Sequence, residues 1–315
     1  MLGYSTNFEE GKRDNMAVSS DTLENNLLFS GAKHTDKRMI IAGLDSCIVS
    51  DVGERIYNED SALIVRHPKI PEFKLIAVAD GMGGGQSGEK FSSETIKKLE
   101  QWFSRIEVSE ADFKSSEYYK TVYASLRECI INIDKELKAS LGTNGATTLA
   151  AAVVCGDYTI LLNIGDSRIY NYFDGNLICL TEDQKKFMSA NNKYGLTNFL
   201  PADGITAFRY NDSYKYIPTN SLGYLVLCTD GVHGVLADSI ISDVLLKNSD
   251  STNNMASRLV EYAVASDCEY NHDNTTVAVV RIGGSGPLCT SVMFCPDADG
   301  DDDNDNVKVW PPRKR

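Results

Sequence analysis

The stretch LIAVADGMGGGQSG, residues 75–88, joins an apolar run to an aspartate and a series of glycines. Short apolar runs that are bounded by glycine are typical of buried strands. A carboxylate at the end of such a strand loses hydration, so another group must compensate its charge. The stretch therefore predicts a buried strand that ends at Asp80 and brings a carboxylate to a functional site.

The same pattern occurs at other positions in the chain. LLNIGDS, residues 161–167, and LVLCTDG, residues 225–231, are also apolar runs that stop at an aspartate. Two acidic segments, Glu59-Asp60 and Asp273-Asn274, directly precede further apolar runs. Divalent cations such as Mg²⁺ and Mn²⁺ are bound by clustered carboxylate oxygens. Because so many acidic residues lie at strand ends, we expect them to converge on a shared cation site.

The composition is that of an ordinary globular protein. The 315 residues are 42% hydrophobic and 24% charged, which allows a large core. The formal net charge of −13 argues against nucleic-acid binding, which needs a basic surface. No apolar stretch approaches the about 18 residues of a membrane span, and the eight cysteines form no Cys-x-x-Cys pair. These features predict a cytoplasmic protein that binds neither nucleic acid nor membranes, and they leave its oligomeric state open.

Helical and strand periodicities predict an α+β fold. Helices are expected at 89–105, 118–141, 237–247 and 252–266. Successive strands in the middle of the chain have no helix between them, so their sheets should be largely antiparallel. The expected strands are 40–50, 60–66, 73–79, 147–155, 157–164, 168–173, 176–181, 205–210, 214–217, 224–229 and 275–282. This order predicts a four-layer αββα sandwich, in which two antiparallel sheets are flanked by helices and metals bind at one end of the sheets.

Changes in composition near both ends predict three regions. Residues 1–38 are polar and predict a loosely ordered arm with a short helix near Asp21–Phe29. Residues 39–283 carry the periodic segments and predict a single domain. Residues 284–315 include an aspartate-rich tract, Asp297–Asn306, and predict a disordered acidic tail.

The glycines after Asp80 also fit a different kind of site. Read from Gly83, the chain matches the Gly-x-Gly-x-x-Gly fingerprint of dinucleotide-binding proteins. That fold needs a second parallel strand soon after the helix, whereas a polar segment and a second long helix follow here. A nucleotide cofactor is therefore disfavoured. The glycines instead predict a tight turn that lets the Gly81 carbonyl approach a metal.

Six short motifs occur in the order found in one enzyme family. They are RIYNED (55–60), DGMGG (80–84), GATT (145–148), GDSR (165–168), TDG (229–231) and DN (273–274). With these motifs, residues 40–283 resemble the metal-dependent type 2C serine/threonine protein phosphatases, also known as the PPM family. Met82 stands where animal members have a histidine, which indicates the bacterial-type branch.

The resemblance implies bound Mn²⁺ or Mg²⁺, as two or three ions. The ligands implied for the first ion are Asp80, the Gly81 carbonyl, Asp230 and Asp273. Those implied for the second are Asp80, Gly81 and either Glu59 or its neighbour Asp60. Those implied for a third, weaker ion are Asp166 and Asp230. Asp80 would thus bridge the first two ions.

The resemblance also implies catalytic roles. Arg55 would hold the substrate phosphate with its planar guanidinium, and Arg55, Asp80 and Asp230 are the residues expected to be catalytic. Thr147, Thr148 and Asn274 are expected to support the ligands. His233 is expected to pack or to form hydrogen bonds rather than to act as a catalytic acid.

These features together predict a metal-dependent phosphoprotein phosphatase. It would hydrolyse phosphoserine and phosphothreonine by direct attack of a metal-bridging water, and its partners would be phosphorylated proteins that a serine/threonine kinase modifies. The alternative is a catalytically weak or inactive regulatory or binding module with the phosphatase fold. It is suggested by residues 181–217, the family's substrate-bordering flap, where Glu182-Asp183-Gln184-Lys185 replaces the usual Asp-His.

Overall fold

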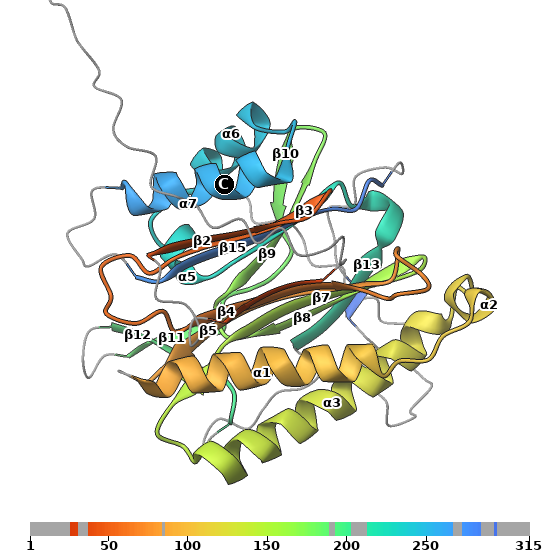
Figure 1. Ribbon diagram of the computed structural model, residues 1–315, viewed down its shortest axis with the longest axis horizontal. Coiled ribbons are helices and arrows are strands. Elements are labelled where there is room, and N and C mark those ends of the chain that lie inside the picture. Colours follow the sequence, from red (N-terminus) through yellow and green to blue (C-terminus); the bar gives the residue numbers. More distant parts are fainter. Residues whose placement is uncertain are drawn as a thin grey trace, which may run out of the picture.

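Two antiparallel sheets pack face to face in the structure, a computed structural model, and helices cover both outer faces (Figure 1). The structure describes residues 26–30, 37–83, 86–188, 193–202, 213–266, 273–284 and 293–294. Every strand pair in these ranges is antiparallel. The predicted four-layer αββα sandwich is confirmed.

The larger sheet lies next to the two long helices. Its strands, in order across the sheet, are β1 (Leu27–Ser30), β4 (Asp60–Arg66), β5 (Lys74–Met82), β7 (Leu149–Cys155), β8 (Tyr158–Ile164), β13 (Tyr214–Pro218) and β16 (Met293–Phe294). The short strand β6 (Ala146–Thr147) pairs with the end of β5. Because β7 is antiparallel to β5, the strand that follows the glycine-rich segment forms no βαβ unit, and the nucleotide-binding alternative is wrong.

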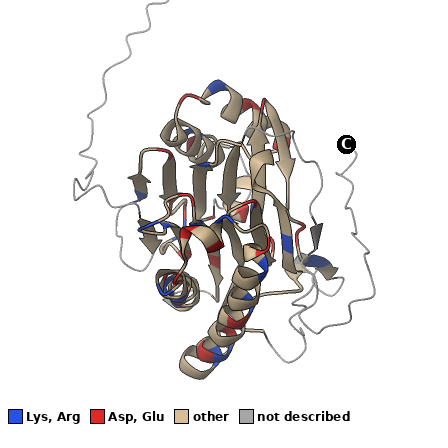
Figure 2. Ribbon diagram, turned by 90° about the vertical axis from the view of Figure 1, so that its right-hand side faces the viewer, with Lys and Arg blue, Asp and Glu red and all other residues tan. Residues whose placement is uncertain are grey.

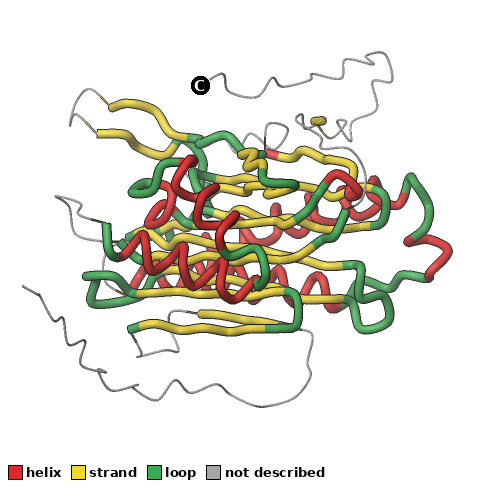
Figure 3. Tube along the Cα trace, turned by 90° about the horizontal axis from the view of Figure 1, so that it is seen from above, coloured by secondary structure: helices red, strands yellow, loops and turns green. Residues whose placement is uncertain are grey.

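The smaller sheet lies on the other side of the core. Its strands, in order, are β10 (Asn176–Cys179), β9 (Arg168–Phe173), β14 (Tyr224–Cys228), β15 (Thr275–Arg281), β3 (Ser46–Asp51) and β2 (Arg38–Ala42). A separate hairpin of β11 (Lys185–Met188) and β12 (Lys193–Leu196) projects from the body, at the upper left of Figure 3.

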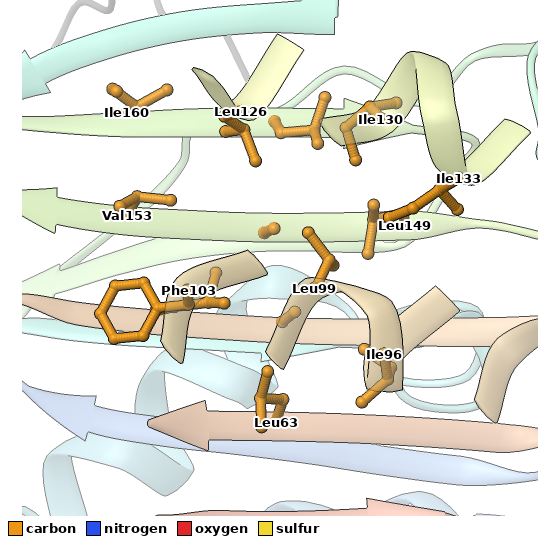
Figure 4. Packing of buried hydrophobic residues seen from close by; sticks show 14 of the residues in the cluster. Leu63, Ile96, Leu99, Phe103, Leu126, Ile130, Ile133, Leu149, Val153 and Ile160 are labelled. Carbon is orange, nitrogen blue, oxygen red and sulfur yellow. The ribbon is translucent and has the colours of Figure 1, made fainter. Parts of the chain in front are cut away.

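The helices bury apolar stripes against the sheets. The long helices α1 (Gln86–Ser104) and α3 (Tyr118–Leu141) cover the larger sheet, and α6 (Asp238–Lys247) and α7 (Thr252–Val264) cover the smaller one (Figure 1). Short helical turns are α2 (Glu110–Phe113), α5 (Asp230–His233) and η2 (Thr219–Ser221). Ile96 and Leu99 of α1 and Leu126 and Ile130 of α3 are buried and belong to one hydrophobic cluster between these helices and the sheet (Figure 4). Burial of each such side chain contributes about 1.5–3 kcal/mol.

The outer surfaces of these helices carry charges of both signs. Figure 2 shows acidic and basic residues interspersed along the helices below the larger sheet, and Lys98 of α1 forms an ion pair with Glu136 of α3. Among the helices that the structure describes, none combines the length and apolar character needed to cross a membrane.

Alternation along the strands decides which residues face the other sheet. In β4 and β5, Ala62 and Val78 belong to the core between the two sheets, whereas Leu63 and Ala77 pack towards the helices. This is the period of two that strands impose. Asp60 and Asp80 are paired in register and continue the face of Ala62 and Val78. The two acids therefore point to the end of the core between the sheets.

The structure corrects the predictions for both ends of the chain. The helix predicted near Asp21–Phe29 is wrong for Leu27–Phe29, which lie in β1, while residues 21–25 lie outside the described residues. A short apolar run fits either element, and pairing with β4 selects the strand. Met293 and Phe294, in the predicted disordered tail, form β16, because the edge strand β13 offers unpaired backbone groups.

One predicted strand is divided in the structure, and another lies outside the described residues. The strand predicted at 40–50 is divided into β2 and β3 by a turn at residues 43–45, in which the Gly43 N–H donates to the Ser46 carbonyl at 2.7 Å. The strand predicted at 205–210 lies outside the described residues.

Candidate active site

A cleft of about 850 Å³ opens at the end of the sheets where β5 and β14 stop and where β4 and β15 start. Its lining brings together residues from distant segments of the chain. The predicted site residues that line it are Arg55, Glu59, Asp80, Gly81, Asp166, Asp230 and Asp273. Asp60 is 1% exposed and does not line the cleft. The expectation that carboxylates at strand ends converge on one place is met.

The backbone of Asp80 is held by two threonines. Its N–H donates to Thr148 Oγ1 at 3.0 Å, and Thr147 Oγ1 donates to its carbonyl oxygen at 3.0 Å. The Thr148 N–H donates to the same carbonyl at 2.9 Å. Thr147 and Thr148 thus fix the backbone position of Asp80.

Asn274 fixes the segment that carries Arg55 and Glu59. Its Oδ1 accepts the Glu59 N–H at 2.8 Å. Its Nδ2 donates to the carbonyls of Val52 and Tyr57 at 2.9 and 3.0 Å. One amide side chain beside Asp273 therefore shapes the loop before β4.

Gly81 lies against the first turn of α1. Its N–H donates to the Glu59 carbonyl at 3.1 Å. A Cβ atom at this position would lie 2.2 Å from the Gly88 carbonyl oxygen and 2.7 Å from the Glu59 carbonyl oxygen. Only glycine permits this approach of three backbone segments, and the approach brings the Gly81 backbone to the cleft wall beside Asp80.

The carboxylates share one electrostatic environment. Burial, followed by the charges of Asp230, Asp60, Asp273 and Asp166, raises the pKa of Asp80 well above its usual range. Burial and the charges of Asp166 and Asp273 raise the pKa of Asp230 to about 6. Burial also raises the pKa of Asp60 to about 8, with added repulsion from Asp273 and Asp230. Each negative charge thus destabilises the others, which is the condition that a cation relieves.

The donor atoms fit Mg²⁺ or Mn²⁺. The ligands on offer are carboxylate oxygens and a backbone carbonyl, which hard divalent ions prefer. Glu59 Oε1 and Asp60 Oδ1 are buried and have no hydrogen-bond partner, and such atoms are costly unless a ligand satisfies them. The fit lies in the chemistry of the donors: within the described residues, no group of three or more His, Cys, Asp or Glu side chains is arranged so that it could hold a metal ion.

Arg55 lies at the exposed rim of the cleft. Its Nη2 donates to Asp273 Oδ2 at 2.8 Å, and the two side chains are 51% and 43% exposed. This contact ties Arg55 to a residue predicted to be a metal ligand. The guanidinium has further N–H donors, so it can bind an anion while it contacts Asp273.

Residues 50–283 match the family described as Protein phosphatase 2C. The chain belongs to this family. The family and the class of enzyme predicted from the sequence, a protein phosphatase, are therefore confirmed.

Two bacterial relatives illustrate the match. The chain is 23% identical over 240 residues to serine/threonine phosphatase stp of Listeria welshimeri. The matched region covers 72% of this chain and 91% of that protein. It is 26% identical over 241 residues to serine/threonine protein phosphatase PstP of Mycobacterium tuberculosis. This matched region covers 73% of this chain and 44% of PstP.

Solved structures share the fold. Serine/threonine phosphatase Stp1 of Staphylococcus aureus superposes with a TM-score of 0.60 at 19% identity, covering 79% of this chain and 99% of that one. The catalytic domain of PstP in complex with two manganese ions superposes with a TM-score of 0.55 at 24% identity, covering 75% and 96%. Both support the sandwich architecture of this phosphatase.

Lys185 and His233 of the phosphatase lie near the site, and the motifs reveal no role for Lys185. Lys185 lines the cleft, and its Nζ lies 3.4 Å from Asp166 Oδ2. Its only signal in the sequence is the unusual Glu182-Asp183-Gln184-Lys185 segment. His233 is 8% exposed, its Nε2 has no hydrogen-bond partner, and burial lowers its pKa to about 4. A histidine that is neutral at physiological pH is a poor proton donor, and a packing or hydrogen-bonding role for His233 stays a prediction.

Proposed function

We propose that this phosphatase hydrolyses phosphoserine and phosphothreonine in proteins with the help of two Mn²⁺ or Mg²⁺ ions. One observation carries the proposal: five acidic residues from distant segments line a single cleft together with Arg55 and the Gly81 backbone. The serine/threonine specificity in the names of its relatives supports the choice of substrate.

We assign Asp80, Asp230, Asp273, Glu59 and the Gly81 carbonyl to the two ions. Between the neighbouring acids, Glu59 is the direct ligand, since it lines the cleft, whereas Asp60 is 1% exposed and does not. Asp60 supports the site from behind, where its Oδ2 accepts a hydrogen bond from Thr229 Oγ1 at 3.0 Å. When bound, the ions activate a water molecule for attack on phosphorus and neutralise the developing charge.

Arg55 binds and orients the phosphate. Its half-exposed guanidinium stands at the cleft rim and is steadied by Asp273. A planar fork of N–H donors matches two phosphate oxygens and keeps its charge at any physiological pH. Loss of Arg55 should therefore weaken substrate binding more than it slows the chemical step.

Protonation of the leaving group falls to solvent. Met82, which lines the cleft after Asp80-Gly81, has no proton to donate. His233 does not line the cleft, and its lowered pKa of about 4 leaves it neutral at pH 7. With Met82 and His233 excluded, water that enters the open end of the cleft can supply the proton.

The test is a phosphatase assay on a phosphothreonine peptide, with EDTA and Mn²⁺ titrations run in parallel. The wild type should be inactive in EDTA and regain turnover with Mn²⁺, and Asp80→Asn should reduce kcat by about 10³ or more. Asp243→Asn, on the exposed surface of α6, is the matched control and should keep wild-type activity. Full turnover by Asp80→Asn would show that the site is assigned to the wrong residues.

The alternative of an inactive binding module has no specific support in the described residues, because each predicted cleft carboxylate is present. A cytoplasmic location and an opposing serine/threonine kinase stay predictions. If the purified protein hydrolysed no phosphopeptide at any Mn²⁺ concentration, the binding module would become the better hypothesis.

A further inference from the structure

Lys185, the first residue of β11, contacts two acids at the cleft wall. Its Nζ lies 3.4 Å from Asp166 Oδ2 and 3.2 Å from Asp183 Oδ2, and its side chain is 31% exposed. Among the described residues that line the cleft, Arg55 and Lys185 are the ones with cationic side chains. Asp166 is the residue to which the family resemblance gave a third metal ion. In this chain, the Lys185 ammonium already forms an ion pair with the Asp166 carboxylate.

The backbone before Lys185 is fastened to the loop that carries Asp166. The Gln184 N–H donates to the Gly165 carbonyl at 2.9 Å, and the Gly165 N–H donates to Gln184 Oε1 at 2.9 Å. Asn163 Nδ2 donates to the Glu182 carbonyl at 2.8 Å, and Gln184 Nε2 donates to the Asn163 carbonyl at 3.0 Å. These four hydrogen bonds hold Lys185 next to Asp166, unlike a lysine on an open surface.

A buried ion pair completes the support for the ammonium. Arg168 donates from Nε and Nη2 to the two oxygens of Asp183 at 2.7 and 2.8 Å, and from Nη1 to the Tyr170 hydroxyl at 3.0 Å. Burial alone would raise the pKa of Asp183, but Arg168 and Lys185 outweigh it and lower the pKa to about 2. Asp183 therefore stays charged and offers Lys185 a fixed second acceptor.

We propose that the Lys185 ammonium is a built-in cation of the cleft that takes the place of a third divalent ion at Asp166. A divalent ion at the Asp166 carboxylate would have to displace the ammonium or lie beside it. Two positive charges on neighbouring sides of one carboxylate repel each other strongly. The residues thus do not fit a third metal ion. The inference rests on the proposed two-ion phosphatase site, and it makes Lys185 a positioning residue that also offsets the negative charge facing a phosphate.

Counting bound Mn²⁺ tests this role directly, by calorimetry and by the electron paramagnetic resonance signal of free Mn²⁺. We expect the wild type to bind two ions per chain. Lys185→Met should gain a third, weaker site, which raises the count from two ions per chain to three under the same conditions. Adding Asp166→Asn to Lys185→Met should abolish the new site.

Two control variants separate charge from folding. Lys185→Arg keeps the positive charge and should retain two sites. Lys186→Met removes the next lysine of β11, which is exposed and does not line the cleft, and it should also retain two sites. Thermal unfolding should show that all variants are folded.

The inference is overturned if Lys185→Met binds the same number of ions as the wild type, or if the wild type already binds three. Neither result depends on turnover. A protein with the lysine-dependent third site but without phosphatase activity would refute the proposed function and leave this inference intact. An active phosphatase whose ion count does not change in Lys185→Met would do the reverse.

Discussion

Replacement of Asp230 by asparagine should abolish activity and yet stabilise the metal-free protein. In the absence of ions, Asp230 lies in a group of acids that raise its pKa to about 6. Its carboxylate is therefore less stable in the folded chain than in the unfolded chain. Asparagine keeps the shape and can still form a hydrogen bond with Asp80, but it carries no charge.

The size of the gain follows from the pKa. A rise from 3.8 to about 6 corresponds to about 3 kcal/mol of destabilisation by the ionised form. Because Asp230 lines an open cleft, solvent screens part of the repulsion. We therefore expect Asp230→Asn to raise the free energy of unfolding by about 2 kcal/mol. For a domain of this size, that raises the unfolding midpoint by about 4–8 °C.

The sign of the pH dependence is determined as well. The folded-state pKa lies above the ordinary value, so the penalty is fully present above pH 6 and disappears as the pH falls towards 3.8. The advantage of Asp230→Asn should thus be largest near pH 7–8 and shrink towards about pH 4.

The measurement is thermal unfolding of wild type and variant in EDTA and in Mn²⁺. In EDTA at about pH 7.5, Asp230→Asn should unfold at the higher temperature. Mn²⁺ should stabilise the wild type far more than the variant, because the variant lacks a ligand. Asp243→Asn, at an exposed ion pair of α6, should leave the unfolding temperature unchanged. If Asp230→Asn were as stable as the wild type in EDTA, or less stable, mutual repulsion of the carboxylates would not describe this site.

Three further outcomes are expected. Gly81→Ala should destabilise the fold by about 3 kcal/mol or more in urea unfolding, since its Cβ would lie 2.2 Å from the Gly88 carbonyl oxygen; an unchanged midpoint would contradict this contact. Arg55→Ala should raise the KM for a phosphothreonine peptide about 10–100-fold with a smaller change in kcat, as expected for loss of a charged hydrogen bond; an unaltered KM would remove Arg55 from substrate binding. Lys74→Met should stabilise the protein by about 1–3 kcal/mol below pH 8, because burial lowers the pKa of Lys74 to about 8. This gain in the free energy of unfolding should vanish as the pH rises from 8 towards 10.5. Urea unfolding of both proteins across this pH range measures it, and a gain that stayed constant with pH would contradict the explanation.

The sequence alone was sufficient for the architecture and for most of the cleft. Alternating and helical periodicities depend only on local spacing, so strands such as β4 and helices such as α3 are visible before any fold is known. Acids at the ends of apolar runs are just as visible, since antiparallel strands can bring such ends to one edge of a sandwich. Glu59, Asp80, Asp166, Asp230 and Asp273 were all found in this way.

Tertiary structure decided what depends on contacts between distant segments. Leu27–Phe29 could be helix or strand until β1 paired with β4. Register and depth put Glu59 at the cleft and Asp60 behind it, although the two are adjacent in the chain. Lys185 meets Asp166 only because hydrogen bonds fasten the segment before β11 to the Gly165 loop. The local sequence pattern determines which face of a strand or helix a side chain lies on. Its charged neighbours depend on which distant segment packs against that face.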